Sequence, residues 1–251
     1  MGGRPWVFGA MPAERLQKVM AAAGFCSRRR GEDLLRQGRV RVNGAPASLG
    51  DRADPSRDRI CVDGRPLGRP ATPTTLLLNK PPGVVSTCHD PRGRPTVLDL
   101  LRGEQRHGLG LHPVGRLDAD SRGALLLTND GTLTLQLTHP RYGHSKTYRV
   151  WLAGTPARDT LDRWREGVPL DGQPCRPVGV RTLRHRRDAT LLELVMREGR
   201  NRQIRRTAES LGHPVLDLQR FAIGELRLDD LQEGQWRPLG PGECRALVER
   251  P

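Results

Sequence analysis

The sequence predicts an α+β fold, with a small unit of two helices and a hairpin ahead of a larger unit built on a sheet. Near the N-terminus, apolar residues recur at helical spacing, and an Asn43-Gly44 pair marks a tight turn between short strands. Further along, the apolar runs over 76–78 and 124–127 are typical of buried strands, and they alternate with helical segments. A proline-containing stretch over 68–74 separates the two patterns and is expected to be an extended linker.

The N-terminal unit is expected over residues 14–67, after a flexible tail over 1–13. A first helix begins at Glu14, turns Leu16, Val19, Met20 and Ala23 to one side, and ends at Gly24. The hydroxyl of Ser27 can cap a second helix, which runs to about residue 37 before Gly38. Strands follow over 40–42 and 60–62.

The C-terminal unit is expected over residues 75–251. Its predicted strands lie at 76–79, 124–127, 146–152 and 190–196, with edge strands at 221–224 and 234–239. Its predicted helices lie at 96–101, 132–138, 158–165 and 202–211, the last of them capped by Asn201.

The charge balance of the chain indicates a polyanionic partner. The net charge is +14, from 42 basic and 28 acidic residues, and only Lys18, Lys80 and Lys146 among the basic residues are lysines. A GC-rich coding bias explains the preference for Arg over Lys, but it does not explain the excess of basic residues. Because guanidinium groups bind phosphate in bidentate fashion and stack on bases, this excess favours nucleic acid.

The sequence offers no pattern that would hold a cofactor or a metal ion. Its five cysteines are widely spaced, without a Cys-x-x-Cys pair or zinc-ligand spacing, so we expect reduced thiols. No glycine-rich phosphate loop lies between a strand and a helix. No apolar segment approaches the length of a membrane span, and the start lacks the apolar core of a signal peptide. We therefore expect a cytoplasmic protein that binds no cofactor, metal or membrane.

The segment Gly115–Asp118 (GRLD) precedes a turn-rich stretch and the buried run Leu125–Leu127. On its own, such an aspartate is commonly a turn former or a helix cap. Together with the residues LLLTNDG over 125–131, however, the segment resembles the signature of RNA pseudouridine synthases, in particular the RsuA/RluB branch that acts on ribosomal RNA. The Lys80–Gly83 segment (KPPG) resembles the start of the catalytic domain in this family. The resemblance implies a mixed, largely antiparallel sheet with flanking helices and a central cleft.

The N-terminal unit resembles the small RNA-binding domain named after the fourth small-subunit ribosomal protein. The similarity lies in the segments 24–29 (GFCSRR) and 38–44 (GRVRVNG). A run of positive side chains at a helix start opposes the helix dipole, so phosphate contact is a better explanation for it than a merely solvated surface. The residues of this unit expected to bind RNA are Arg28, Arg29, Arg30, Arg39, Arg41 and Asn43.

A third informative segment is Glu198–Arg206 (EGRNRQIRR). On a helix, Arg202, Arg205 and Arg206 share one face while Ile204 lies on the opposite, apolar face. A solvated charged face would give the same pattern. Beside the other motifs, the segment resembles the third motif of the same synthase branch. We expect Arg200, Arg202 and Arg206 to contact RNA.

The resemblance also implies roles for single residues. Asp118 is the catalytic carboxylate, acting either as a nucleophile on the ribose or as a base toward a sugar proton. Arg205 pairs with Asp118 and keeps it ionised. Tyr148 stacks on the base; the alternative is that Tyr148 is an ordinary half-buried tyrosine of a strand. Arg116 reaches phosphate or fills the gap that the displaced nucleotide leaves. Leu117 and Ile204 supply apolar support.

These expectations describe an enzyme that isomerises uridine to pseudouridine in ribosomal RNA. The wording of the third motif favours 23S rRNA over 16S rRNA, and no surface pattern demands more than a monomer. Two other possibilities remain at this point. The chain could be an inactive RNA-binding assembly factor for the ribosome, or a basic protein with a general RNA chaperone role.

Overall fold

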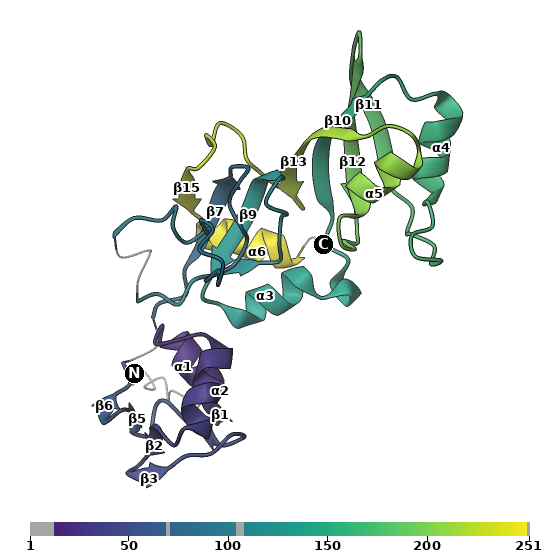
Figure 1. The fold of residues 1–251 in the computed structure, drawn as a ribbon. Coiled ribbons are helices and arrows are strands. Elements are labelled where there is room, and N and C mark those ends of the chain that lie inside the picture. Colours follow the sequence, from purple (N-terminus) through teal and green to yellow (C-terminus); the bar gives the residue numbers. More distant parts are fainter. Residues whose placement is uncertain (1–12, 69–70, 104–107, 250–251) are drawn as a thin grey trace, which may run out of the picture. The chain divides into compact units, whose positions relative to one another are not determined.

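The computed structural model describes residues 13–68, 71–103 and 108–249, which form two compact units (Figure 1). Unit 1 comprises Met1–Pro73 and Arg102–Leu111, and unit 2 comprises Thr74–Leu101 and His112–Pro251. Residues 102–111 were predicted to belong to the C-terminal unit. In the structure they group with unit 1, where Gly108 lies against the backbone of Gly24. Residues 1–12 of the expected tail over 1–13, and residues 69 and 70 of the expected linker, lie outside the described residues.

Unit 1 is the predicted pair of helices with short strands. Its elements are β1 (Glu14–Arg15), α1 (Leu16–Ala22), α2 (Arg28–Arg36), β2 (Val40–Val42), β3 (Ala45–Pro46), β4 (Arg52–Ala53), β5 (Ile60–Val62) and β6 (Arg65–Pro66). Ser27 Oγ accepts a hydrogen bond from the backbone N–H of Arg30, so the predicted cap of α2 is confirmed. Asn43 and Gly44 both have positive φ angles, as the tight turn between β2 and β3 requires. Buried Leu16, Met20 and other apolar side chains form its core.

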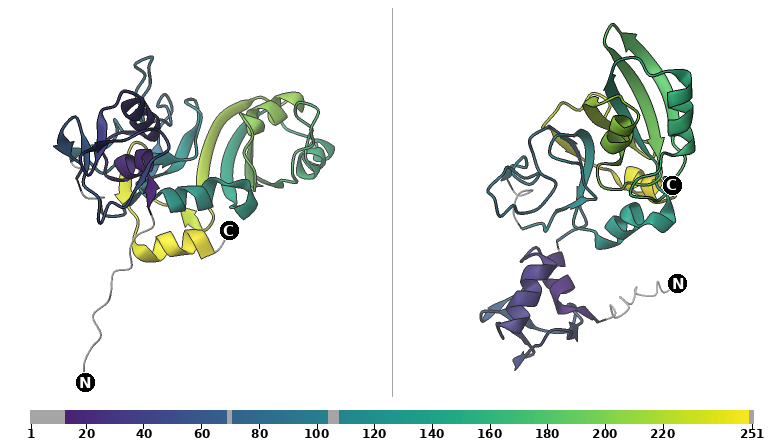
Figure 2. Two further views of the ribbon diagram at one scale, coloured as in Figure 1. Left: turned by 90° about the horizontal axis from the view of Figure 1, so that it is seen from below. Right: turned by 45° about the vertical axis from the view of Figure 1, so that its right-hand side comes forward.

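Unit 2 is built on one mixed sheet (Figures 1 and 2). Its strands are β7 (Thr75–Lys80), β8 (His112–Val114), β9 (Arg122–Thr128), β10 (Lys146–Ala153), β11 (Gly179–Arg186), β12 (Ala189–Met196), β13 (Val215–Ile223), β14 (Leu226–Arg227) and β15 (Trp236–Pro238). Its helices are α3 (Gly131–Thr138), the 3-10 turn η2 (Pro140–Tyr142), α4 (Arg158–Glu166), α5 (Gln203–Ser210) and α6 (Pro241–Glu249). The strand order is β11-β12-β10-β13-β9-β7-β15, with β14 beside β13 and β8 beside β9. Only the pairing of β13 with β9 is parallel among the described strands, which confirms the predicted α+β class.

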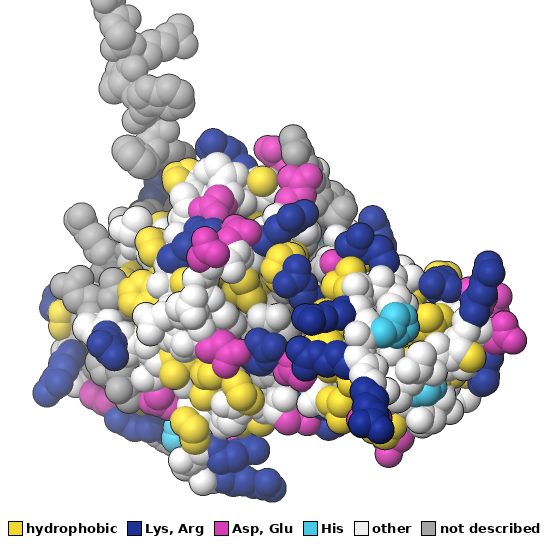
Figure 3. Space-filling model, turned by 90° about the horizontal axis from the view of Figure 1, so that it is seen from above, with side chains coloured by type: hydrophobic (Ala, Val, Ile, Leu, Met, Phe, Trp, Pro, Cys, Tyr) yellow, Lys and Arg dark blue, Asp and Glu magenta, His cyan; other side chains and the backbone are white. Residues whose placement is uncertain are grey.

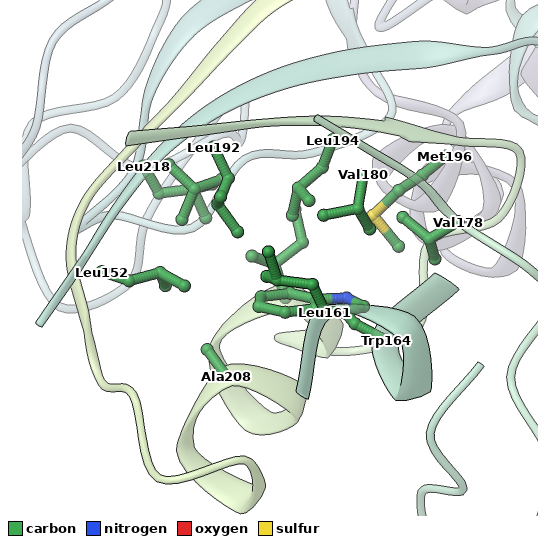
Figure 4. Packing of buried hydrophobic residues seen from close by; sticks show 12 residues of the cluster. Leu152, Leu161, Trp164, Val178, Val180, Leu192, Leu194, Met196, Ala208 and Leu218 are labelled. Carbon is green, nitrogen blue, oxygen red and sulfur yellow. The ribbon is translucent and has the colours of Figure 1, made fainter. Parts of the chain in front are cut away.

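Two apolar cores flank different parts of this sheet. Leu77 and Leu126 pack with Leu133 and Leu137 of α3 and with Leu247 of α6. In the other half, Figure 4 shows side chains of β10, β11, β12 and β13 pointing toward α4 and α5, with Trp164 among them. Each half of the sheet therefore has helices that cover it, and the two halves meet at β9 and β13.

The seam between the halves is short and tightly packed. Arg122 pairs with Gln219 and Gly123 pairs with Arg220, and these are the only residue pairs that the β9–β13 ladder contains in the described part of the chain. A Cβ atom on Gly123 would overlap the carbonyl oxygen of Arg220, and the φ angle of Gly123 is +111°. Arg122 also forms a bidentate ion pair with Asp217, at 2.9 and 2.7 Å. The seam thus requires a glycine at position 123.

The structure corrects three predictions of secondary structure. Residues 96–101 form turns rather than a helix, because both the N–H and the hydroxyl of Thr96 donate to the carboxylate of Asp99 at 2.8 Å. The segment predicted as an edge strand at 221–224 belongs to β13, which lies between β10 and β9. β11 was not predicted at all, because its exposed arginines obscure the alternation of the strand.

Candidate active site

Asp118 lies on the loop between β8 and β9, and the segment after β7 holds this loop in place. The hydroxyl of Ser86 donates to the carbonyl of Leu117 at 2.8 Å and accepts from the N–H of Leu117 at 3.1 Å. The N–H of Gly83 donates to the carbonyl of Ala119 at 2.7 Å. The side chain of Leu117 is buried, whereas that of Asp118 is about one-third exposed. The loop therefore anchors its apolar residue and presents its carboxylate to solvent.

A buried lysine lies beneath the same loop. Lys80 is fully buried, and its Nζ donates to the carbonyl oxygens of Pro81, Ala119 and Ser121 at 2.9, 3.4 and 2.7 Å. Burial lowers the pKa of Lys80 to about 8, although the nearby carboxylates of Asp120 and Asp118 oppose this shift. The sequence pointed to the Lys-Pro segment but gave Lys80 no role. Only the fold shows that its ammonium group ties the start of the segment to the Asp118 loop.

Two arginines of the third motif reach this loop, but their pairing differs from the one expected. Nη1 of Arg202 lies 3.5 Å from Oδ2 of Asp118, and the same guanidinium donates to the carboxylate of Asp120 at 3.2 and 3.0 Å. Arg205, which was expected on Asp118, instead lies 3.3 Å from Oδ2 of Asp120 and donates to the Asp120 carbonyl at 2.9 Å. The physical reason is the backbone: Arg202 precedes α5 in a left-handed conformation, with φ +48°, and is not part of the helical face.

The carboxylate of Asp120 completes this group of charges. Burial opposes its ionisation, but the hydrogen bonds from Arg202 and the positive charge of Arg205 outweigh that effect and lower its pKa. Asp120 therefore binds both arginines as a carboxylate. Arg202 is the guanidinium that lies nearest to Asp118 in the described part of the chain.

A cavity of about 350 Å³ opens beside Asp118. Of the predicted site residues, Arg116, Leu117, Asp118, Tyr148, Arg200, Arg202, Ile204 and Arg205 all line it. Met196 and Leu218 contribute further apolar wall, and Tyr148 lines the cavity from the first half of β10. This volume falls within the range of small-molecule sites, and its walls combine an aromatic ring, aliphatic side chains and guanidinium groups. Such a cavity suits a flat polar base with a sugar attached.

The turn before α5 is built differently from the prediction. Asn201 forms no side-chain cap; the side chain of buried Gln203 accepts from the N–H of Arg200 at 3.1 Å and donates to Glu198 at 2.7 Å. The guanidinium of Arg200 donates to the carbonyls of Gln173 and Pro174, so it holds a neighbouring loop. Arg206 lies outside the cavity and forms an ion pair with Asp171. The predicted RNA contacts at positions 200 and 206 thus have structural partners of their own.

In unit 1 the predicted RNA contacts fall into two groups. Arg39 forms a bidentate pair with Asp63, Arg41 donates to the Gly44 carbonyl, and Asn43 bonds to Asp58 and to the N–H of Arg59. These contacts stabilise the hairpin. Arg28, Arg29 and Arg30 are exposed at the start of α2 and form no ion pair within the described part of the chain. Figure 3 shows Lys and Arg side chains spread over the molecular surface among acidic ones.

Comparison with known proteins identifies the family. The model of the family described as "RNA pseudouridylate synthase" matches residues 74–210, which include Asp118, Tyr148 and the third motif. The chain belongs to the RNA pseudouridylate synthase family. The model of the S4 domain matches residues 14–60 of this synthase, so the predicted resemblance of both units is confirmed.

Similar proteins cover nearly the whole synthase. It is 39% identical over 237 residues to "Ribosomal large subunit pseudouridine synthase B" of Bacillus subtilis, covering 93% of this chain and 95% of that protein. It is 37% identical to an uncharacterized RNA pseudouridine synthase of Aquifex aeolicus, over 94% of each chain. A solved structure described as "Crystal structure of pseudouridylate synthase" aligns with a TM-score of 0.66 and 32% identity, over 93% of this chain and 99% of that one.

The described residues contain neither a metal-binding cluster nor a membrane-spanning helix. No group of three or more His, Cys, Asp and Glu side chains there is arranged to hold a metal ion. None of the helices in that part of the synthase is long and apolar enough to cross a membrane.

Proposed function

We propose that this synthase converts uridine to pseudouridine in ribosomal RNA, with 23S rRNA as its target and Asp118 as its catalytic residue. The observation that carries the proposal is that Asp118 and Tyr148 line the same cavity, which is of nucleoside size. The choice of 23S rRNA rests on the relatives, since those of Bacillus subtilis and Pseudomonas aeruginosa are both named for the large ribosomal subunit.

In the proposed reaction the carboxylate of Asp118 acts on the ribose of the bound uridine. It attacks C1′ as a nucleophile, or removes a proton from the sugar as a base; in either case the bond between N1 of uracil and C1′ breaks. The freed uracil turns within the cavity and a bond forms between C5 and C1′. In the nucleophilic route the ester bond between Asp118 and C1′ breaks as this bond forms, and in the base route Asp118 returns its proton to the sugar. The proton on C5 is then lost and N1 gains one, so the product is an isomer of the substrate and needs no cofactor.

The arginines and the buried lysine place the carboxylate. Arg202 lies against Asp118 at the wall of the cavity, while Arg205 and Lys80 fix the loop through carbonyl oxygens of residues 119–121. A loop held at several points presents the reacting oxygen at a defined position, which lowers the entropic cost of reaching the transition state. Tyr148 and Ile204 would hold the uracil ring between them as it turns.

The target uridine must leave its helix to reach Asp118. Flipping a nucleotide costs a few kcal/mol and is least costly in loops and bulges. Arg28, Arg29 and Arg30 of unit 1, which are exposed and form no ion pair with described residues, would offset this cost by binding phosphate. Because ribosomal RNA is the proposed substrate, we place this activity in the cytoplasm. We assign it to a monomer, since no pattern in the sequence demands a partner chain.

The test is to map pseudouridine in rRNA from a strain that lacks the gene. Carbodiimide-blocked reverse transcription should show one 23S position that loses its stop, and wild-type protein should restore it while Asp118→Ala should not. The Asp118→Ala protein should bind RNA as tightly as the wild type. A stop lost from 16S rRNA instead would correct the target, and an unchanged pattern in both rRNAs would favour an inactive assembly factor.

A further inference from the structure

One face of the sheet in unit 2 is not covered by the helices that pack on its other face. Figure 4 shows α4 and α5 on the same side of β10, β11, β12 and β13, with Leu152, Leu192 and Leu194 pointing toward them. Side chains alternate along a strand, so the residues between these point the other way. We call this second side the open face. It is formed by Thr147, Arg149, Trp151, Arg181, Arg184, Arg186, Leu191, Glu193, Val195, Gln219 and Phe221.

Strand register brings the arginines of the open face together. Arg181 lies opposite Glu193, which lies opposite Arg149. In the next row, Arg184 lies opposite Leu191, which lies opposite Trp151. Directly opposed residues of antiparallel strands share a face, so both rows project to the same side. Tyr148, next to Arg149 in β10, projects to the opposite side and lines the active-site cavity.

The guanidinium groups of two of these arginines lie over aromatic rings. The guanidinium carbon of Arg149 is 3.8 Å from the centre of the Phe221 ring, and that of Arg186 is 4.2 Å from the centre of the Trp151 ring. Stacking of this kind holds the guanidinium plane in place and leaves its N–H groups free at the edge. The Nε atom of Arg149 is buried and has no hydrogen-bond partner among the described residues.

The positive charge of the open face is largely unbalanced. Arg181 forms an ion pair with Glu193 at 2.8 Å, but Arg149, Arg184 and Arg186 form none within the described ranges. Some arginines elsewhere in unit 2 are paired with carboxylates: Arg122 with Asp217, Arg206 with Asp171 and Arg237 with Glu243. The described part of the chain therefore leaves guanidinium groups without acidic partners on this surface.

The open face is also hollowed. A depression of about 590 Å³ is lined by three arginines, two glutamates and an aromatic ring: Arg149, Arg181, Arg227, Glu193, Glu225 and Phe221. Arg227, like Arg149, forms no ion pair with any described residue. The depression therefore combines guanidinium donors with an aromatic ring, which is the combination that binds the phosphates and bases of a single-stranded nucleic acid.

We propose that the open face is a second RNA-contact surface, which binds the backbone of an RNA segment other than the one that carries the target uridine. The inference rests on the proposed function insofar as it takes RNA as the substrate. RNA is favoured over a protein partner because unpaired, planar guanidinium groups match phosphate in bidentate geometry. Because β10 sends Tyr148 to one side and Arg149 to the other, the two RNA segments bind opposite sides of one sheet.

The test uses the double variant Arg184→Gln/Arg186→Gln in the full-length protein. Both residues are exposed on the β11–β12 hairpin, and the matched control Arg158→Gln/Arg163→Gln removes the same charge from exposed positions on α4. The probe is a uridine-free single-stranded RNA, whose dissociation constant is measured by fluorescence anisotropy over a salt series. Losing two phosphate contacts should lower the salt slope of log K by about 1.4, and the affinity should fall several-fold. The control variant should have the salt slope of the wild type, with only a small decrease in affinity that is the same at every salt concentration.

A second variant, Arg149→Gln/Arg227→Gln, probes the depression itself and should show the same loss, with its folding checked by thermal melting. If both variants bind the probe with the slope and affinity of the α4 control, the open face does not bind RNA and the inference is overturned. This result is distinguishable from failure of the proposed function. If the proposed function fails, wild-type protein forms no pseudouridine, and this result does not depend on how the hairpin variant binds RNA.

Discussion

The guanidinium of Arg202 lies 3.5 Å from the carboxylate of Asp118 and also binds Asp120, although Arg202 is 82 residues beyond Asp120 in the chain. Arg205, on the first turn of α5, binds the backbone of the same loop. The two arginines therefore do different things: Arg202 faces the reacting group, and Arg205 holds the loop that carries it. This division of roles leads to the first prediction.

Arg202→Gln should lower kcat about ten-fold without changing the melting temperature, since it removes one charged neighbour of Asp118 from an exposed position. Arg205→Gln should lower both kcat and the melting temperature, because its largely buried side chain bonds to Asp120 and Ser121. Single-turnover pseudouridine assays and thermal melting distinguish the two outcomes. Equal effects of both variants on stability would contradict the division, and Arg158→Gln on α4 is the control.

Tyr148 should act through its ring rather than its hydroxyl. Its aromatic face lines the cavity, and base–aromatic stacking is worth ~1–3 kcal/mol. Tyr148→Phe should therefore keep kcat/KM within a few-fold of wild type, whereas Tyr148→Ala should lower it by roughly ten- to a hundred-fold. The measurement is kcat/KM on an RNA fragment that carries the target uridine. A Phe variant as poor as the Ala variant would show that the hydroxyl takes part instead.

Lys80 should give the activity an alkaline limit. Its pKa is about 8 in the folded protein, so the ammonium group that bonds to the Asp118 loop loses its proton above that pH. We expect the rate of pseudouridine formation to fall as the pH rises through about 8. A rate that stays constant to pH 10, with RNA binding intact, would contradict this.

Deprotonation of Lys80 should affect the stability of the protein in the opposite direction: the activity falls as the pH rises, whereas the free energy of unfolding increases. Between pH 8 and the ordinary lysine value of 10.5, the unfolded chain holds the proton more tightly than the folded one does. The contribution of Lys80 to the free energy of unfolding therefore rises with pH across this window. Urea unfolding of wild type and Lys80→Met at pH 7.5 and pH 9.5 measures this contribution as a double difference. A difference that stays constant or falls between the two pH values would contradict the sign.

Gly123→Ala should be the most damaging glycine substitution at the seam of the sheet. The added methyl group would overlap the backbone of Arg220, and the φ angle of +111° disfavours any side chain. We expect a loss of at least ~2–3 kcal/mol in the free energy of unfolding, because the clash falls on backbone that cannot move aside. Gly242→Ala in α6, where nothing lies within 4 Å of the new Cβ, should leave stability unchanged or slightly higher. Similar melting temperatures for the two variants would contradict the role of the seam.

Much of the fold could be predicted because its signals are local. The cap at Ser27, the turn at Asn43 and Gly44, and the apolar runs of β7 and β9 each depend on a few neighbouring residues. The central place of β13 could not be predicted, because its neighbours β10 and β9 are chosen by packing far along the chain. β11 was not predicted, because its exposed arginines on the open face obscure the alternation of apolar and polar residues that marks a strand.

The candidate site was predicted in its members but not in its pairings. The motifs named Asp118, Tyr148 and Ile204, and the structure brings them to one cavity. Spacing on an ideal helix placed Arg202 and Arg205 on one face, and this failed because Arg202 adopts a left-handed conformation before α5 begins. Lys80 and Ser86 were missed, because a residue that supports a loop through carbonyl oxygens leaves no sequence pattern.

The parallel pairing of β9 with β13 joins two blocks that each contribute to the cavity: Asp118 precedes β9, whereas Tyr148 and Ile204 belong to the block beyond β13. Along the paired strands the junction consists of two residue pairs, one bidentate ion pair and one buried guanidinium, and beside the cavity Arg202 and Arg205 bond to the Asp118 loop. A narrow junction of this kind resists stretching more than twisting. Rotating one block slightly against the other would therefore change the distance between Asp118 and Tyr148. The few bonds that join the blocks thus also determine the width of the cavity entrance for an incoming nucleotide.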